Sequence, residues 1–565
     1  MIEGRLVDLI GQAVDAARAE LGLTGEPPEV ELSRPKHKRF GDFTTNVALV
    51  VASSAGRPPR EVAEAVVGHL PPDDLVTKVE VAGPGFINLW VSQRWLHDVL
   101  RRIVAEDEAY GRGEATGRSV QVEFVSANPT GPLHVGHARN AVLGDAIANV
   151  LAAAGERVER EYYYNDTGRQ MDLFALSVEA RYLERLGRPA AFPEDGYHGE
   201  YVAEVAERLV SEQGDALADL PPEDRRARIH VDAVRLMFDW IEATLARFGI
   251  RFDTRFLERS LEESGAVDVA VQRLREAGHV YDHEGAVWFR ATSFGDDKDR
   301  VLIRSNGVPT YFAKDCAYLM AKFGRGFDHL IYVWGADHHG DVKRVKGAAE
   351  ALGYDPSAVE LFLYQFVSFL RGGKPVTLSK RSGDLLTLDE LLDEVGPDAA
   401  RYTLLTRSHD STIEFDIEEV TRQSLDNPVY YVQYAHARVA SVLRHAADRG
   451  VELFPVEDAD LDRLAEGAEL DLLRRLAAFP EHLQVAAAMR APHRLTRYAE
   501  DLAADFHRFY TECRVVTDDA ALTQARLWLA AATKRVVANV LALIGVSAPE
   551  SMVRQMDDDA SGGSG

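Results

Sequence analysis

A strand, a turn and a long helix that begin near residue 120 constrain the fold more than any other feature of the sequence. Residues 120–126 (VQVEFVS) form a short β-branched, apolar run, as in a strand buried within a parallel sheet. The run ends at an Asn-Pro-Thr-Gly-Pro turn, a helical pattern covers about 135–154, and a second strand pattern covers 157–164. Strand, helix and strand in this order predict the opening of a right-handed βαβ unit.

The βαβ unit predicts a Rossmann-type α/β domain over 113–395. Amphipathic helical patterns fill about 172–278, which predicts a helical insertion inside this domain. Strand patterns return at 286–292, 300–305, 329–335 and 359–370.

Two further domains are expected on either side. Residues 1–112 mix helical and strand patterns, starting with a helix near 2–21, and predict a small α+β domain. Residues 396–556 show apolar spacings of three and four almost throughout, which predicts an all-α bundle. The tail 557–565 is acidic and then rich in Gly and Ser, so it is expected to be disordered.

Composition excludes several classes of protein. The 565 residues are 46% hydrophobic and 27% charged, as in ordinary globular proteins. Two distant cysteines, Cys316 and Cys513, indicate a reducing compartment and no Cys-based zinc site. We find no signal peptide and no apolar run long enough for a membrane span, so a cytoplasmic location is expected. The net charge of −26 argues against a protein that coats nucleic acid nonspecifically.

The motif His134-Val-Gly-His137 follows the first strand of the βαβ unit. A helix N-terminus at this place gathers backbone N–H groups and the positive end of the helix dipole, which suits a phosphate. Both histidines can donate hydrogen bonds to phosphate oxygens, and Gly136 lets an adenosine approach the backbone. The alternatives are a metal pair or two capping histidines, and on this pattern alone the nucleotide interpretation has roughly even odds.

A second motif lies far downstream, at 372–383 (GGKPVTLSKRSG). It is a basic, glycine-containing loop after a strong strand pattern. Mobile lysines near a phosphate-binding helix would stabilise the charge that builds on a leaving pyrophosphate. Taken alone, the loop could equally be a solvated surface loop.

Together the two motifs resemble the HIGH and KMSKS motifs of class I aminoacyl-tRNA synthetases. Within that class, the chain is similar to the bacterial arginyl-tRNA synthetases. The runs that carry this resemblance are 41–49 (GDFTTNVAL), 123–146, 162–170 (YYYNDTGRQ), 295–318, 332–344 (YVWGADHHGDVKR), 426–438 and 544–550. They span nearly the whole chain in the expected order.

The resemblance implies a two-step ligation of L-arginine to tRNA(Arg). The arginine carboxylate attacks the α-phosphorus of ATP, which releases pyrophosphate, and the 2′-hydroxyl of the terminal adenosine of tRNA then takes the arginyl group. Both steps depend on stabilising anionic oxygens and need no covalent enzyme intermediate. Mg²⁺ is expected to arrive with ATP, and neither zinc nor another resident metal is expected.

By resemblance, His134, His137 and Lys380 are the catalytic residues. The ATP site is expected to comprise Gly131, Leu133, His134, Gly136, His137, Ser379, Lys380 and Arg381. The chain departs from the family pattern at Thr377, which stands where the motif has its first lysine. Whether Lys374 or Arg381 replaces that charge is open.

The arginine site is expected to contain carboxylates that pair with a planar guanidinium. Tyr311 and Asp315 are four residues apart and so share a helix face. The resemblance implies that they help bind the arginine side chain. It also implies that Asn128 binds the amino-acid end, with Glu123 nearby on the strand, and that Asp337 or His338 completes the pocket. The alternative is that Asp315 caps a helix or pairs with a lysine such as Lys314 or Lys322.

For tRNA, the resemblance implies contacts from both flanking domains. Lys36, Lys38, Arg39 and Phe40 would contact the tRNA elbow, although they could form an ordinary solvated loop. Tyr430, Tyr434 and Arg438 would stack on anticodon bases. Such a stripe is more often core, with Ala435 and Val439 as its packing face.

Two rival functions remain. One is an amino-acid-activating enzyme that works without tRNA, and the other is a catalytically inactive RNA-binding regulator. The intact motifs and the RNA-binding domains argue against both. A monomer is expected, with its basic clusters 34–39, 343–346 and 371–381 gathered on one side.

Overall fold

The computed structural model describes residues 2–24, 26, 28–35, 37–376 and 386–552. The chain forms two compact units. The first comprises Met1–Asp107, Val451–Ala477 and Phe509–Ala532, and the second comprises Glu108–Gly450, Ala478–Arg508 and Thr533–Gly565. The predicted domain boundaries at 112 and 396 stay predictions.

The first unit contains an antiparallel sheet packed against helices. Its strands β1 (Leu32–Ser33), β2 (Phe43–Thr45), β3 (Val76–Ala82) and β4 (Phe86–Val91) have the order β1-β2-β4-β3. Its helices include α1 (Ile2–Leu21), α2 (Val47–Ala55), α3 (Pro59–Gly68), α4 (Arg94–Glu106) and α17 (Gly467–Ala477). Helix α1 buries Leu6, Ile10, Ala13 and Ala17, a spacing of three and four that turns one apolar stripe toward the core.

A five-stranded parallel sheet is the centre of the second unit. Its order is β12-β11-β5-β6-β7, formed by β5 (Ser119–Glu123), β6 (Arg157–Tyr164), β7 (Thr254–Leu257), β11 (His329–Gly335) and β12 (Val359–Tyr364). The chain passes from β5 through α5 (Ala138–Ala153) to β6 on one side, and β11 lies on the other side of β5. The strand order therefore reverses between β5 and β11. Such a reversal opens a crevice at the carboxyl ends of these two strands, where doubly wound folds bind ligands.

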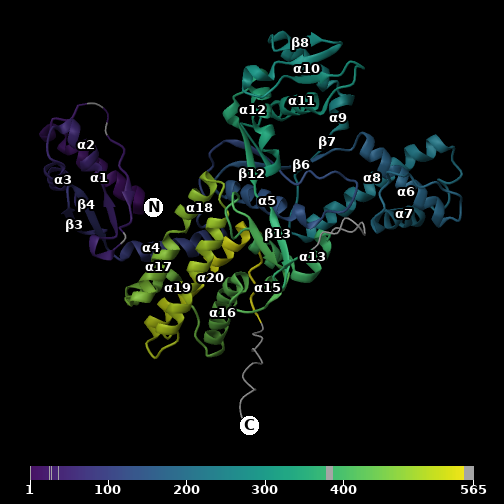
Figure 1. The fold of residues 1–565 in the computed structure, drawn as a ribbon. Coiled ribbons are helices and arrows are strands. Elements are labelled where there is room, and N and C mark those ends of the chain that lie inside the picture. Colours follow the sequence, from purple (N-terminus) through teal and green to yellow (C-terminus); the bar gives the residue numbers. More distant parts are fainter. Residues whose placement is uncertain (1, 25, 27, 36, 377–385, 553–565) are drawn as a thin grey trace. The chain divides into compact units, whose positions relative to one another are not determined.

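The predicted Rossmann-type fold is confirmed, but the helical insertion is shorter than expected. Helices α6 (Arg169–Arg185), α7 (Glu200–Gln213) and α8 (Pro222–Arg247) form one group in Figure 1. Residues 254–257, inside the predicted 172–278 insertion, instead form β7 and pair with β6. A four-residue strand between helices leaves too few residues for a period of two to be recognised.

Smaller elements complete the second unit. Strands β8 (Val280–His283), β9 (Ala286–Phe289) and β10 (Arg300–Ile303) form an antiparallel sheet beside α9 (Arg259–Glu263), α10 (Ala266–Glu276), α11 (Tyr311–Gly324) and α12 (Val342–Ala351). Strands β13 (Val367–Arg371), β14 (Lys374–Pro375) and β15 (Ile413–Asp416) form a third sheet. Strand β15 interrupts the stretch after residue 396 that was expected to be helical.

The remaining helices follow β14. They are α13 (Leu388–Val395), α14 (Pro397–Leu404), α15 (Ile417–Thr421), α16 (Pro428–Asp448), α18 (Phe479–Ala488), α19 (His493–Glu512) and α20 (Ala520–Leu543). Within the described part of the chain, no helix is both long and apolar enough to cross a membrane.

Candidate active site

The chain leaves β5 through a strained turn. Val125 and Ser126 have φ values of 64° and 42°, a left-handed conformation that a β-branched residue such as Val125 rarely adopts. The N–H of Val125 donates to Oδ1 of Asn140 (2.5 Å), and Nδ2 of Asn140 donates to the carbonyl of Val333 (2.7 Å). Asn140 on α5 thus ties the turn after β5 to β11 and holds the crevice open between them.

The two histidines of the HVGH motif are held as neutral hydrogen-bond donors. Nδ1 of His134 accepts from the N–H of Gly136 (3.1 Å), and Nδ1 of His137 accepts from the N–H of His134 (3.3 Å). Since a backbone nitrogen only donates, each neutral ring carries its proton on Nε2. Burial lowers the pKa of His134, and burial together with His134 lowers the pKa of His137 to about 3. Both rings therefore offer an Nε2–H at neutral pH.

Gly136 is required by the packing of the motif itself. A Cβ at this position would lie 2.7 Å from Cε1 and 2.8 Å from Nδ1 of His134. Any side chain would push the His134 ring out of its capping position. The capping interpretation of the histidines is thus correct for their Nδ1 atoms, and it leaves their Nε2 atoms available to a ligand.

The segment after the basic loop is joined to the HVGH motif. The N–H of Val135 donates to the carbonyl of Leu386 (3.1 Å), and the N–H of Leu388 donates to the carbonyl of Leu133 (2.8 Å). Thr387 caps α13, and its backbone forms an isolated antiparallel β-bridge with His134. The segment 386–388, which follows the basic loop and lies more than 200 residues from the HVGH motif in the sequence, therefore meets that motif here.

A cavity of about 590 Å³ lies at the carboxyl ends of β5, β6 and β11, and we call it the Asp315 cavity. Eight predicted site residues line it: Glu123, Asn128, His134, Gly136, His137, Asp315, Asp337 and His338. The sequence placed these residues on separate elements, and the sheet brings them to one crevice.

Asp315 gives this cavity an unbalanced negative charge. The residue is exposed, but its surface opens into the cavity, where desolvation and the negative charges of Glu123 and Glu258 raise its pKa to about 7. It forms no ion pair with any described residue. Lys314 pairs with Glu258 and Glu262, and Lys322 pairs with Glu123, so the alternative that Asp315 pairs with either lysine is wrong. Thr310, not Asp315, caps α11.

The other predicted arginine-binding residues differ in burial and in the hydrogen bonds that they already form. Glu123 is buried and accepts from Lys322 Nζ (2.5 Å) and Ser126 Oγ (3.2 Å). Nδ2 of Asn128 donates to Gln170 Oε1 (2.8 Å). Asp337 and His338 are exposed along the cavity wall. Tyr311 begins α11, is 65% exposed, and does not line the cavity.

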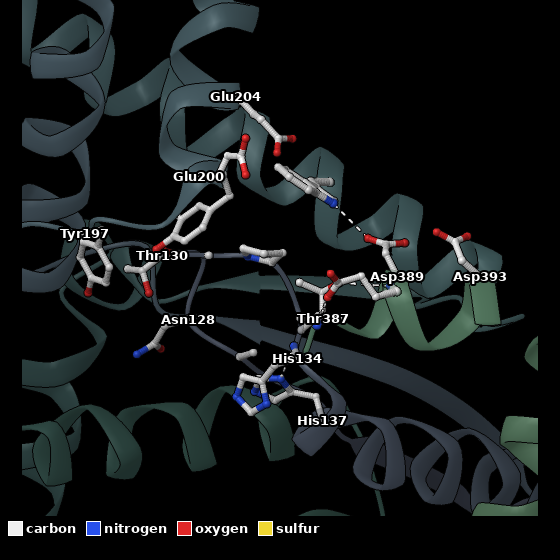
Figure 2. A pocket seen from close by; sticks show the side chains of 17 residues that line it. Asn128, Thr130, His134, His137, Tyr197, Glu200, Glu204, Thr387, Asp389 and Asp393 are labelled. Atoms are coloured by element: carbon white, nitrogen blue, oxygen red, sulfur yellow. Dashed lines mark hydrogen bonds between the residues drawn. The ribbon is translucent and has the colours of Figure 1, made fainter. Parts of the chain in front are cut away.

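A second cavity of about 710 Å³, the Tyr201 cavity, shares the two histidines of the HVGH motif with the Asp315 cavity (Figure 2). The predicted ATP-site residues Gly131 and Leu133 line it, as do Asn128, His134 and His137. The insertion closes this cavity, because Tyr201 on α7 donates to the carbonyl of Thr130 (2.9 Å). Helix α8 reaches α13 here, with Trp240 Nε1 donating to Asp389 (3.1 Å). The insertion thus contacts both segments that meet at His134.

Sequence reasoning missed several residues of the Asp315 cavity. Tyr163, Tyr318, Tyr332 and Trp334 line it but were not predicted, and nor was Asn140. Three of them lie on β6 and β11, near the carboxyl ends of two strands beside the crevice. Their position at strand ends was the available signal, but strand order is needed to see that they face one site.

Some predicted residues lie outside the described residues. They are Lys36 in the N-terminal loop and Thr377, Ser379, Lys380 and Arg381 in the basic loop. The side chain of Lys38 is not described either. Of the basic loop, the structure describes Lys374, which is exposed on β14.

The predicted tRNA-binding residues lie in both units. In the first, the guanidinium of Arg39 covers the ring of Phe40 at 4.7 Å, and Phe40 is 38% exposed. In the second, Tyr430, Tyr434 and Arg438 are half-buried on α16, with Arg438 over Tyr434 at 5.4 Å. Ala435 and Val439 are buried, which confirms the predicted packing face.

Cys316 and Cys513 are both buried free thiols. In the described ranges, no group of three or more His, Cys, Asp or Glu side chains is arranged to hold a metal ion.

Comparison with known proteins agrees with this geometry. Three family models match the chain: the arginyl tRNA synthetase N-terminal domain at 5–91, the class I (R) tRNA synthetase catalytic domain at 99–439, and the DALR anticodon binding domain at 432–552. The arginine–tRNA ligase of Moorella thermoacetica is 50% identical over 551 residues, 97% of this chain and 98% of its own.

Solved structures with a similar fold are also arginyl-tRNA synthetases. A putative arginyl-tRNA synthetase from Campylobacter jejuni is 34% identical, with a TM-score of 0.75 over 82% of this chain and 100% of its own. The arginyl-tRNA synthetase of Thermus thermophilus is 25% identical, with a TM-score of 0.76 over 98% of this chain and 100% of its own. This chain belongs to the arginyl-tRNA synthetases, a family of class I aminoacyl-tRNA synthetases.

Proposed function

We propose that this chain ligates L-arginine to tRNA(Arg) and that the Asp315 cavity receives the guanidinium of arginine. The observation that carries this proposal is the carboxylate of Asp315, which has no cationic partner among the described residues and lies in one cavity with the HVGH histidines. A planar cation with paired N–H donors supplies the missing charge and the missing hydrogen bonds together.

The first step joins the arginine carboxylate to ATP. A carboxylate oxygen attacks the α-phosphorus, the bond to the bridging oxygen breaks, and pyrophosphate leaves with the electron pair. The Nε2–H groups of His134 and His137 donate to phosphate oxygens as the negative charge redistributes. Because both rings are neutral, they act as fixed dipoles and transfer no proton. Mg²⁺ would arrive with ATP and would supply positive charge to its phosphates.

In the second step the 2′-hydroxyl oxygen of the terminal adenosine attacks the arginyl carbonyl. The bond from that carbonyl carbon to the phosphate oxygen breaks, AMP leaves with the electron pair, and the hydroxyl proton is released to water. The loop around Lys36, Lys38, Arg39 and Phe40 contacts the tRNA elbow, and Tyr430, Tyr434 and Arg438 contact the anticodon. The half-buried state of the three α16 residues supports partial exposure of that face. We also propose a monomeric, cytoplasmic enzyme, from the resemblance alone.

Lys380 is expected to stabilise the leaving pyrophosphate. It lies six residues before Leu386 in the sequence, and the carbonyl of Leu386 accepts from the N–H of Val135 in the HVGH motif. Replacing Lys380 by alanine should lower kcat for adenylate formation by more than about tenfold, or ~1.4 kcal/mol. Single-turnover adenylate formation measures this directly, and a smaller loss would remove Lys380 from the mechanism.

The pH dependence of kcat/KM for arginine should follow the titration of the Asp315 carboxyl group. The guanidinium binds the ionised carboxylate, so kcat/KM for arginine should rise with pH through about 7 and level off above it. The sign follows because protonation below that pH removes the charge that attracts the ligand. Arginine-dependent ATP–pyrophosphate exchange from pH 5.5 to 9, at saturating tRNA, measures the profile. A flat profile over this range would contradict the assignment.

The experiment that tests the function is ATP–pyrophosphate exchange with each amino acid, with and without total tRNA. We expect arginine to be the only amino acid that supports exchange, and we expect this exchange to require tRNA. We also expect the protein to arginylate tRNA(Arg). Full exchange without RNA would favour the amino-acid-activating enzyme. Binding of tRNA with no exchange under either condition would favour the inactive RNA-binding regulator.

A further inference from the structure

Asp389 connects the helical insertion to the segment that meets the HVGH motif. It lies in the first turn of α13 and lines the Tyr201 cavity. Its Oδ2 accepts from Trp240 Nε1 (3.1 Å) and from the hydroxyl of Thr244 (2.7 Å), and its Oδ1 accepts from Arg247 Nη1 (2.5 Å). One carboxylate of α13 therefore receives three donors from α8.

The three donors share one face of α8. Trp240, Thr244 and Arg247 are spaced by four and then three residues, so their side chains leave the helix on the same side. Thr244 is 1% exposed, and the guanidinium of Arg208 on α7 lies over the Trp240 ring at 5.2 Å. The helix dipole alone would favour an acid in the first turn of α13 without any of these partners. The hydrogen bonds to Asp389 therefore specify where α8 lies against α13.

The start of α13 also holds the backbone of the HVGH motif. Leu386 and Leu388 exchange backbone hydrogen bonds with the residues on either side of His134, and Thr387 forms its β-bridge with His134 itself. Asp389 follows Thr387 by two residues, and Figure 2 shows Thr387 between Asp389 and His134. A displacement of the first turn of α13 would therefore also displace His134.

We propose that Asp389 is a positioning residue for adenylate formation: its bonds to Trp240 and Thr244 fix the start of α13, and the start of α13 fixes the Nε2–H of His134. This inference rests on the proposed role of the HVGH histidines as donors to phosphate oxygens. The position of such a donor is critical, because a misplacement of about 1 Å can cost on the order of 10²-fold in rate. The helical insertion thereby contributes to the geometry of the first reaction step.

Replacing Asp389 by alanine removes the acceptor for all three donors. We expect kcat for arginine-dependent ATP–pyrophosphate exchange at saturating tRNA to fall about tenfold, while the KM values for arginine and ATP change by less than about twofold. Asp389→Asn keeps an acceptor for Trp240 and Thr244, so its kcat should stay within about threefold of wild type. A kcat within about twofold of wild type in Asp389→Ala, or an equal loss in the alanine and asparagine variants, would overturn the proposal.

Asp393 offers a matched control on the same helix. Its side chain is 70% exposed and pairs with the same Arg247, whereas Trp240 and Thr244 donate to Asp389. Asp393→Asn should therefore leave kcat within about twofold of wild type. A loss as large as that in Asp389→Ala would assign the effect to the charge of Arg247 and would overturn the proposal.

A double-mutant cycle tests whether Asp389 acts through His134. In a His134→Ala background, Asp389→Ala should lower the single-turnover rate of adenylate formation by less than about twofold, because the donor that it positions is already absent. Losses that multiply would overturn the proposal, since a general loss of structure lowers the rate in both backgrounds.

Trp240→Phe carries the same cycle if Asp389→Ala does not fold. It removes the indole N–H, so the expected loss is about threefold in the wild-type background and less than about 1.5-fold with His134→Ala. Equal losses in the two backgrounds would overturn the proposal. A rate unchanged by His134→Ala alone would instead overturn the proposed role of the histidine, so the two failures are distinguishable.

Discussion

Replacing Asp315 by asparagine is expected to lower kcat/KM for arginine by about 10³-fold, or ~4 kcal/mol. The substitution keeps the size of the side chain and removes a cavity charge that forms no ion pair with any described residue. Losing one partner of a desolvated, hydrogen-bonded charge pair typically costs about 2–5 kcal/mol. An asparagine also turns an NH₂ group toward a ligand that has only donors at this end.

The measurement is arginine-dependent pyrophosphate exchange with saturating tRNA. The KM for ATP should change by less than about twofold, because the histidines proposed to contact its phosphates are untouched. The exposed residue Asp355, which caps a short turn before β12, offers a matched Asp→Asn control that should leave both values unchanged. A loss below about tenfold in Asp315→Asn would show that another group receives the guanidinium.

Replacing Arg401 by methionine is expected to destabilise the second unit by about 3–5 kcal/mol. This arginine on α14 is fully buried and donates to three segments: the carbonyl of Phe248 (2.8 Å), the carbonyl of Ile544 (3.1 Å) and the carboxylate of Asp145 (2.5 Å). Methionine fills the volume but leaves the Asp145 carboxylate buried without this partner. Gly545 packs so closely on the guanidinium that a Cβ there would lie 2.1 Å from Nη2.

Urea unfolding followed by fluorescence and by loss of exchange activity measures this effect. The first unfolding transition should move to clearly lower urea concentration in Arg401→Met. Arg497→Met is the matched control, because Arg497 is a 73% exposed side chain with only surface ion pairs, and it should change stability by less than about 0.5 kcal/mol. Equal shifts in the two variants would contradict the assigned role of Arg401.

The sequence was sufficient for the elements whose pattern is long and regular. The helix at 2–21 and the strand at 157–164 agree with α1 and β6 residue by residue. Strand β7 was missed because four residues give too little periodicity, although it closes one edge of the main sheet.

The candidate site could be predicted in part for a similar reason. One motif located His134 and His137, and the resemblance added Glu123, Asn128 and Asp315. The partners of the lysines could not be predicted: Lys314 and Lys322 both lie near Asp315 in sequence, yet each pairs with a glutamate brought by another element. Asn140 contributes to the site through tertiary contacts alone, which no local pattern shows.

Net charge was a misleading average for this chain. A net charge of −26 argues against a protein that coats RNA nonspecifically. The family to which the chain belongs nevertheless acts on tRNA, a folded RNA. The informative quantity is local: an unbalanced carboxylate in one cavity and neutral donors at a helix start. Charge that matters for recognition is the charge left without a partner.

The central claim is that Asp315 recognises the charge of arginine, and discrimination between arginine and citrulline tests it most directly. The ratio of kcat/KM for the two amino acids should be measured for the wild type and for Asp315→Asn in the same exchange assay. We predict a strong preference for arginine in the wild type that falls by at least about 10²-fold in the variant, because only arginine loses a charge pair. An equal loss for both amino acids, with the ratio unchanged, would contradict the account.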